Sequence, residues 1–175
     1  LPVYQRQHFP EALLGEALPR FASAGTTVHE DAALRLWTLD GDVLIASIKT
    51  KMHTISPAVA EGLALAVDRA EQSYQGLVIW SGDEPFSAGA DLQALLPAFM
   101  MGGVAAIEEV EAELQRVMLK LRYAQVPVVA AMRGLALGGG CELAVHCARR
   151  VAHMESYVGL VEVGVGLVPG AGGLT

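Results

Sequence analysis

The apolar pattern of the chain becomes regular at Leu34 and predicts paired strands from there. Residues 34–39 alternate between apolar and polar positions, and residues 43–48 form a second apolar-rich run. Asp40 and Gly41, between these runs, are a hairpin turn signal. Short apolar runs at 77–80 and 127–131 favour strands buried on both faces, and residues 151–154 indicate a further strand.

Helical spacing of apolar residues predicts helices between these strands. Ser56 is a candidate N-cap, Pro57 suits the first helical position, and Gly76 should end the helix that they begin. A longer amphipathic helix is predicted over 104–121, with Glu111 among the polar positions largely outside its apolar face. Strands that alternate with helices imply an α/β fold, in which helices cover a parallel sheet.

Two shorter helices are predicted near the glycine-rich segments. Asp91 is a plausible N-cap for a short helix that Pro97 should interrupt. Another helix should follow Gly138 and run to about Cys147.

The first part of the chain lacks a strong period. Residues 1–33 contain several prolines and glycines, so we interpret them as a linker or N-terminal extension with one short helix near 11–17. Ordered structure is expected over 34–175. The chain starts with Leu1 and stops where a helix should begin, so we expect a piece of a longer polypeptide with an incomplete core.

Composition narrows the class of protein. Hydrophobic residues make up 53% of 175 residues, enough for a sizeable core, and the net charge of −7 argues against a nucleic-acid partner. No stretch predicts a membrane span or a secretory leader, so we expect a cytoplasmic protein. Cys141 and Cys147, six residues apart in one helix, cannot bridge and lack the company of a zinc site. We therefore expect buried thiols and no metal.

Three segments carry candidate chemistry. Residues 86–91 follow a predicted strand, and their small side chains let a ligand approach the backbone, although an ordinary turn has the same composition. Three consecutive glycines at 138–140 are costly inside a helix, about 1 kcal/mol each, which suggests exposed N–H groups at its N-terminus. Glu142 lies in the first turn there, either for chemistry or to complement the helix dipole.

The third segment, 159–173, holds a single carboxylate among apolar residues and glycines. Burial would raise the pKa of Glu162 toward the range useful for proton transfer. The residue is therefore a candidate general acid or base, with a solvated loop position as the alternative.

Together, the stretches Ser-Ala-Gly-Ala-Asp, Ala-Leu-Gly-Gly-Gly-Cys-Glu-Leu and Pro-Gly-Ala-Gly-Gly closely resemble the crotonase, or enoyl-CoA hydratase/isomerase, superfamily. The resemblance covers about residues 34–175. It implies a crotonase-like spiral of ββα units, truncated at the C-terminus here, in which two backbone N–H groups hold an acyl-CoA thioester oxygen.

The resemblance also assigns roles. The oxyanion hole would use the N–H groups of Ala88 and Gly139, and Glu142 and Glu162 would flank one water. We expect Glu162 to be the principal acid or base, because its surroundings look drier. Further substrate-binding positions would be Lys51, Met52, Ser87, Ala90, Asp91, Leu92, Gly138 and Gly170.

The segment 51–55 resembles the Lys-Met-Asn-Thr-Leu stretch of multifunctional β-oxidation proteins that join a hydratase to a 3-hydroxyacyl-CoA dehydrogenase. His53 replaces the asparagine of that stretch, and by itself a lone histidine is expected at the surface. Lys51 would lie near the CoA phosphates. No dinucleotide-binding Gly-x-Gly-x-x-Gly unit occurs in the sequence, so NAD is expected only if a dehydrogenase lies outside it.

The resemblance implies an enoyl-CoA hydratase that adds water syn to a 2-trans-enoyl-CoA in fatty acid β-oxidation, with no cofactor beyond the substrate's coenzyme A. The alternatives are a Δ3,Δ2-enoyl-CoA isomerase, another crotonase-type reaction, and a non-catalytic acyl-CoA-binding domain. The intact glutamate pair favours the hydratase. A trimer-type homo-oligomer is expected for the full-length protein.

Overall fold

A mixed six-stranded sheet forms the framework of the computed structural model, which describes residues 25–174. Its strand order is β1-β2-β3-β4-β5-β7, with β1, β2 and β3 antiparallel and β3, β4, β5 and β7 parallel. The strands span Thr26–Glu30 (β1), Leu34–Thr38 (β2), Val43–Ile48 (β3), Gly76–Ile79 (β4), Val128–Met132 (β5) and Arg149–Ala152 (β7). The predicted α/β sheet is therefore confirmed, as is the predicted antiparallel pairing of β2 with β3, and β1 adds a further antiparallel strand at that edge.

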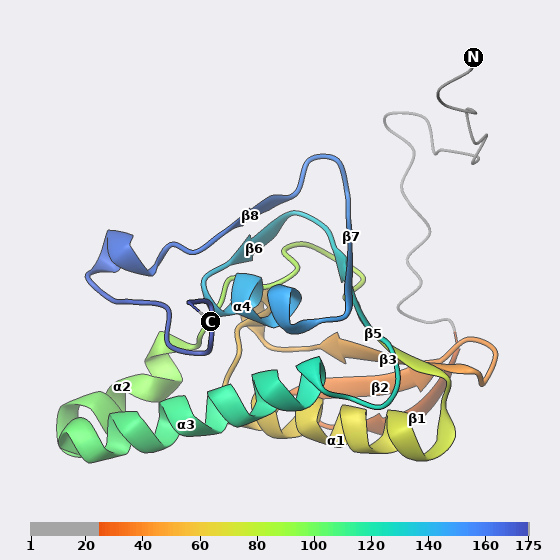
Figure 1. Ribbon diagram of the computed structural model, residues 1–175, viewed down its shortest axis with the longest axis horizontal. Helices are drawn as coiled ribbons and strands as arrows, with labels where there is room; N and C mark the ends of the chain where they lie inside the picture. Colours follow the sequence, from red (N-terminus) through yellow and green to blue (C-terminus); the bar gives the residue numbers. More distant parts are fainter. Residues whose placement is uncertain (1–24, 175) are drawn as a thin grey trace.

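The two longest helices, α1 (Pro57–Ser73) and α3 (Gly103–Arg122), lie side by side along one face of this sheet (Figure 1). α4 (Gly139–His146) packs on α3 and on β6 (Leu135–Leu137), which pairs with β8 (Tyr157–Gly159) in a second, parallel sheet. α2 (Leu92–Met101) joins the loop after β4 to α3. Two 3-10 turns, η2 (Lys51–His53) and η3 (Glu162–Val165), complete the described elements.

The predicted signals account for most of these elements. The Ser56 hydroxyl accepts a hydrogen bond from the N–H of Val59 at 3.3 Å, so Ser56 caps α1, with Pro57 in the first turn. Burial alternates along β3, as a strand with one face in the core requires, whereas β4 is buried at three of its four positions.

Two predictions about the elements are wrong. Residues 26–30 belong to the sheet rather than to a linker, because β-branched Thr26 and Thr27 pair with β2. His29 and Glu30 continue the pairing after a register shift at Val28. Pro97 does not interrupt α2, which continues through it to Met101; the proline, which has no N–H, costs the middle of the helix one hydrogen bond. The predicted helix at 11–17 lies outside the described residues.

Over the described part of the chain, none of the helices is both long enough and apolar enough to cross a membrane.

Candidate active site

The three glycine-rich segments of the sequence meet at one cavity of about 530 Å³. They come from the loop after β4, from the start of α4 and from the chain that follows β8, and α3 closes the remaining side. Apolar side chains make up most of the other walls. Eight residues that the sequence indicated line this cavity: Ala88, Ala90, Leu92, Gly138, Gly139, Glu142, Glu162 and Gly170.

The loop 86–91 is held on both sides by backbone pairing. Ser87 forms a parallel bridge with Ala136 of β6, and Ala90 forms one with Ile55 beyond η2. The fully buried Ser87 hydroxyl donates to the carbonyl of His53 at 2.7 Å and accepts from the N–H of Gly89 at 3.1 Å. Ser87 thus fixes the loop from within and does not line the cavity.

The backbone turn in this loop decides which N–H group faces the cavity. The N–H of Ala88 donates to the carbonyl of Met52 at 3.1 Å, so the expected role of Ala88 as an oxyanion donor needs correction. Gly89 has a φ of 97°, a value that favours glycine and that turns the following peptide. Among the hydrogen bonds of the described residues, the N–H of Ala90 has no acceptor.

The second free N–H group comes from α4. Its first internal hydrogen bond runs from the N–H of Glu142 to the carbonyl of Gly138, which leaves the N–H groups of Gly139 and the next two residues without helical acceptors. A Cβ on Gly139 would lie 3.3 Å from the nitrogen of Ala90. The free N–H groups of Ala90 and Gly139 are therefore neighbours at the cavity wall. For Gly139, this is the position expected of a donor in the oxyanion hole.

α4 can approach the loop this closely only because its first turn lacks side chains. A Cβ on Gly140 would lie 2.6 Å from the carbonyl oxygen of Ser87, closer than real Cβ atoms come to backbone. Packing between two backbones thus requires glycine at 140, and Gly139 lies close to the same loop, whereas Gly138 faces the side chain of Glu162.

Glu142 is the buried carboxylate of the site, with 3% of the residue exposed. Its Oε1 accepts a hydrogen bond from the N–H of Gly173 at 2.9 Å. Burial raises the pKa of Glu142, the Gly173 hydrogen bond opposes this effect, and the charge of Glu162 adds to it. Glu142 is therefore held in a protein hydrogen bond, and its ionised form is disfavoured relative to an exposed glutamate.

Glu162 begins η3 and lies over Gly138, whose Cβ would be 3.2 Å from Glu162 Oε1. It is half-buried, so the expectation that its surroundings are drier than those of Glu142 is wrong. The reason is that η3 runs along the surface, with exposed neighbours at Val163 and Val165. Its Oε2 is nevertheless buried and has no protein partner, so one Glu162 oxygen is unpaired at the cavity.

Both carboxylates lie close enough to Cys141, in the first turn of α4, for their charges to act on its thiol. Burial raises the pKa of Cys141, and the charges of Glu162 and then Glu142 raise it further. Cys141 and Cys147 are free and buried, as predicted.

Three of the remaining predicted residues have other positions. Lys51 and Met52 are exposed and line a separate groove with Trp37 and Trp80. Asp91 caps α2 by accepting from the N–H of Ala94 at 3.1 Å. None of the three lines the cavity with the carboxylates.

His53 is buried with 7% exposed, so the expected surface position is wrong. Its Nδ1 lies 2.5 Å from the carbonyl oxygen of Pro85, and its Nε2 lies 3.4 Å from the Asp83 carboxylate. These contacts draw the ring under the loop after β4, where it supports the Ser87 hydrogen bond rather than the cavity.

Sequence reasoning missed two residues of α3. Glu111 lines the cavity, and Gln115 donates to the carbonyl of Gly170 at 2.7 Å. Glu111 was placed on the polar side of the helix, yet it precedes buried Leu114 and Met118 by three and seven positions. That spacing puts the three residues on one face, which is the signal that could have found Glu111.

Two free N–H groups, one of them at a helix N-terminus, lie beside two carboxylates in an apolar cavity. On a crotonase fold, this arrangement defines an enzyme of the hydratase/isomerase type. The match to known families agrees with it. The enoyl-CoA hydratase/isomerase family model matches residues 44–175, and the chain belongs to this family.

The relatives with curated names are much longer proteins. The chain is 39% identical over 120 residues to the human peroxisomal bifunctional enzyme, covering 69% of this chain and 15% of that protein. It is 33% identical over 136 residues to the peroxisomal fatty acid beta-oxidation multifunctional protein AIM1 of Arabidopsis thaliana, covering 77% and 19%. The chain thus spans less than a fifth of these relatives.

Solved structures support the fold. An enoyl-CoA hydratase from Bacillus anthracis superposes with a TM-score of 0.71 at 26% identity, covering 80% of this chain and 55% of that one.

Proposed function

We propose that this chain carries the catalytic centre of an enoyl-CoA hydratase that adds water syn across the double bond of a 2-trans-enoyl-CoA. The observation that carries the proposal is the joint position of Glu142, Glu162 and the free N–H groups of Ala90 and Gly139 at one cavity. A thioester oxygen seated between the two N–H groups would place the acyl chain among the apolar walls.

The proposed mechanism uses each group in one way. Attack of water at C3 moves negative charge onto the thioester oxygen, and the fixed N–H dipoles of Ala90 and Gly139 stabilise that charge without reorganising. The loss of one such donor typically raises the barrier by about 3–4 kcal/mol. One carboxylate takes a proton from the water, and a proton is delivered to C2 on the same face.

The structure favours a specific division between the two glutamates. Glu162 has an oxygen without a protein partner, which suits the acceptor of the water proton. Glu142 is bonded to Gly173 and has a raised pKa, which suits a group that orients the water and shares the proton.

One observation favours a second activity. Of the two glutamates beside the free N–H groups, Glu162 has an oxygen without a protein partner, and a Δ3,Δ2-enoyl-CoA isomerase needs a single base to move a proton between C4 and C2. If Glu142→Gln loses hydration but still isomerises a 3-enoyl-CoA, the isomerase activity is assigned to Glu162.

The wider setting is part of the proposal. The multifunctional names of the relatives support a longer bifunctional hydratase/3-hydroxyacyl-CoA dehydrogenase in fatty acid β-oxidation. The hydratase step itself would need no cofactor beyond the coenzyme A of its substrate, and NAD would serve only a dehydrogenase part outside this sequence. Lys51, in the separate groove, would lie toward the CoA phosphates.

We also propose a cytoplasmic location and, for the full-length protein, a homo-oligomer of the trimer type. Two free thiols support a reducing compartment. Exposed apolar side chains between 157 and 168 support a contact surface, and light scattering after size exclusion would measure the assembly.

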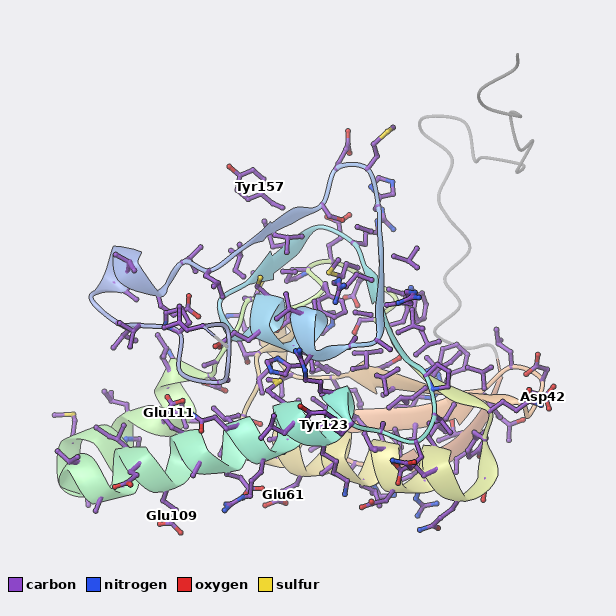
Figure 2. The ribbon with its side chains drawn as sticks, viewed as in Figure 1. Asp42, Glu61, Glu109, Glu111, Tyr123 and Tyr157 are labelled. Carbon is purple, nitrogen blue, oxygen red and sulfur yellow. The ribbon has the colours of Figure 1, made fainter. Side chains whose placement is uncertain are left out.

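Hydration of crotonyl-CoA, followed as loss of the conjugated enoyl absorbance, tests the proposal. Glu142→Gln and Glu162→Gln should each lower kcat by about 10²–10⁴-fold. Glu61→Gln, on the exposed side of α1 away from the cavity (Figure 2), is the matched control and should keep the wild-type rate. Wild-type rates in both active-site variants would refute the mechanism.

A further inference from the structure

Two side chains of α3 hold the chain that follows η3. Gln115 Nε2 donates to the carbonyl of Gly170 at 2.7 Å. One turn earlier, the Glu111 carboxylate lies against the same residue, because a Cβ on Gly170 would be 2.6 Å from Glu111 Cδ. Residues four apart share a helix face, so Gln115 holds Gly170 by a hydrogen bond and the Glu111 carboxylate packs against the same residue.

The same loop, residues 170–173, holds Glu142 at its other end. The N–H of Gly173 donates to Glu142 Oε1 at 2.9 Å, and a backbone hydrogen bond from Ala171 also stabilises the ionised carboxylate. Only two residues lie between Gly170 and Gly173. A shift of the loop at α3 would therefore displace the hydrogen bonds that set the Glu142 carboxylate.

Glu111 has features that a surface glutamate lacks. Its Oε2 is buried without a protein partner, and burial raises the pKa of its carboxyl group. It lies on the side of α3 that faces the loop, whereas Glu109 lies on the opposite side (Figure 2). A buried carboxyl oxygen without a partner lowers the stability of the fold. This cost favours a role for Glu111 at the site.

We infer that Glu111 is a positioning residue that, together with Gln115, fixes the loop 170–173 and through it the carboxylate of Glu142. The effect on catalysis rests on the proposed hydratase function, but the positioning itself does not. The titratable groups around Glu142 are Glu111 from α3, Glu162 from η3, and Cys141 and His146 from its own helix.

Amide hydrogen exchange at Gly173 measures the positioning without any assay of activity. Glu111→Ala and Gln115→Ala should each speed exchange of the Gly173 N–H by about 10-fold or more, since the loop loses its anchor. Glu109→Ala removes an exposed glutamate from the same helix and should leave the rate unchanged. If Glu111→Ala and Gln115→Ala both keep the wild-type exchange rate at Gly173, the inference is overturned.

A second measurement separates an electrostatic contribution from packing. Glu111→Gln keeps the shape but removes a negative charge that raises the pKa of Glu142. The ¹³C carboxyl resonance of Glu142, assigned with Glu142→Gln, should then titrate at lower pH than in the wild type. If the titration of Glu142 does not move in Glu111→Gln and the exchange rate of the Gly173 N–H is unchanged in Glu111→Ala, Glu111 does not position the loop.

Kinetics then connect the inference to the proposed reaction. In hydration of crotonyl-CoA, Glu111→Ala and Gln115→Ala should lower kcat by roughly 10–100-fold, as expected for a misplaced catalytic group, with KM within about twofold. Gly170→Ala should have a similar effect, and the double variant with Glu111→Ala should lose no more than either single one. If the wild type hydrates nothing, the proposed function fails, while the exchange rates still decide the inference.

Discussion

The hydroxyl of Ser87 donates to the carbonyl of His53 at 2.7 Å and so joins the loop after β4 to η2. The same oxygen receives the N–H of Gly89, which immediately precedes the free N–H of Ala90. The buried hydroxyl of Ser87 therefore connects η2 to the residue beside Ala90, whose free N–H is a candidate oxyanion donor.

Replacement of Ser87 by alanine should weaken both the fold and the site. The carbonyl of His53 and the N–H of Gly89 would lose a buried partner, which costs about 1–3 kcal/mol of the free energy of unfolding. Urea unfolding measures the loss, and Ser73→Ala at the exposed end of α1 is the control, expected within about 0.5 kcal/mol of wild type. A stable Ser87→Ala variant with full hydration activity would contradict this account of the loop.

Two glycine substitutions should differ sharply. An alanine at 140 would meet the backbone of Ser87, so Gly140→Ala should destabilise the fold by about 1–3 kcal/mol and abolish most hydration. Gly159→Ala, with nothing near its Cβ position, should change stability little. Thermal unfolding of the two variants compares them, and equal melting temperatures would show that α4 does not abut the loop.

The buried carboxylate of Glu142 should make stability depend on pH. Its pKa is raised in the folded chain, so the stability it contributes is complete below its ordinary value of 4.5 and is lost as pH rises through the folded pKa. Glu142→Gln should therefore be more stable than wild type at pH 8, by about 0.5–2 kcal/mol, with a difference that shrinks toward pH 5. Chemical unfolding across that range measures it, and a less stable Glu142→Gln at pH 8 would contradict the sign.

The thiols should be inert in the folded chain. Burial raises the pKa of Cys147 to about 12, and burial with two nearby carboxylates raises that of Cys141. Since the thiolate is the reactive form, Ellman's reagent at pH 8 should react with neither thiol until guanidinium unfolds the chain, and then with both. Rapid reaction of one thiol without denaturant would place it at the surface.

Local signals predicted most of the framework. The period of α1, its Ser56 cap and the apolar run of β4 are strong because burial dictates them directly. β1 was missed because an edge strand with polar Thr27 and His29 lacks a buried face to reveal it. β6 and β8 have three residues each, too few for any period to appear.

The site was predictable where residue type carries the chemistry, and less so where backbone direction does. Glu142, Glu162 and Gly139 were expected together and line one cavity. Whether Ala88 or Ala90 presents its N–H depends on the turn at Gly89, a conformation that the sequence permits but does not specify. Glu111 was overlooked because a charged residue on an amphipathic helix is usually solvated.

The contact between Gly140 and the Ser87 carbonyl has a consequence for the entropy of binding. The spacing of the Ala90 and Gly139 N–H groups is set by one backbone resting on another, so no rotamer has to be chosen when an oxygen arrives. The ordering of these two donors is completed when the chain folds, and a ligand held there loses little affinity to freezing protein side chains.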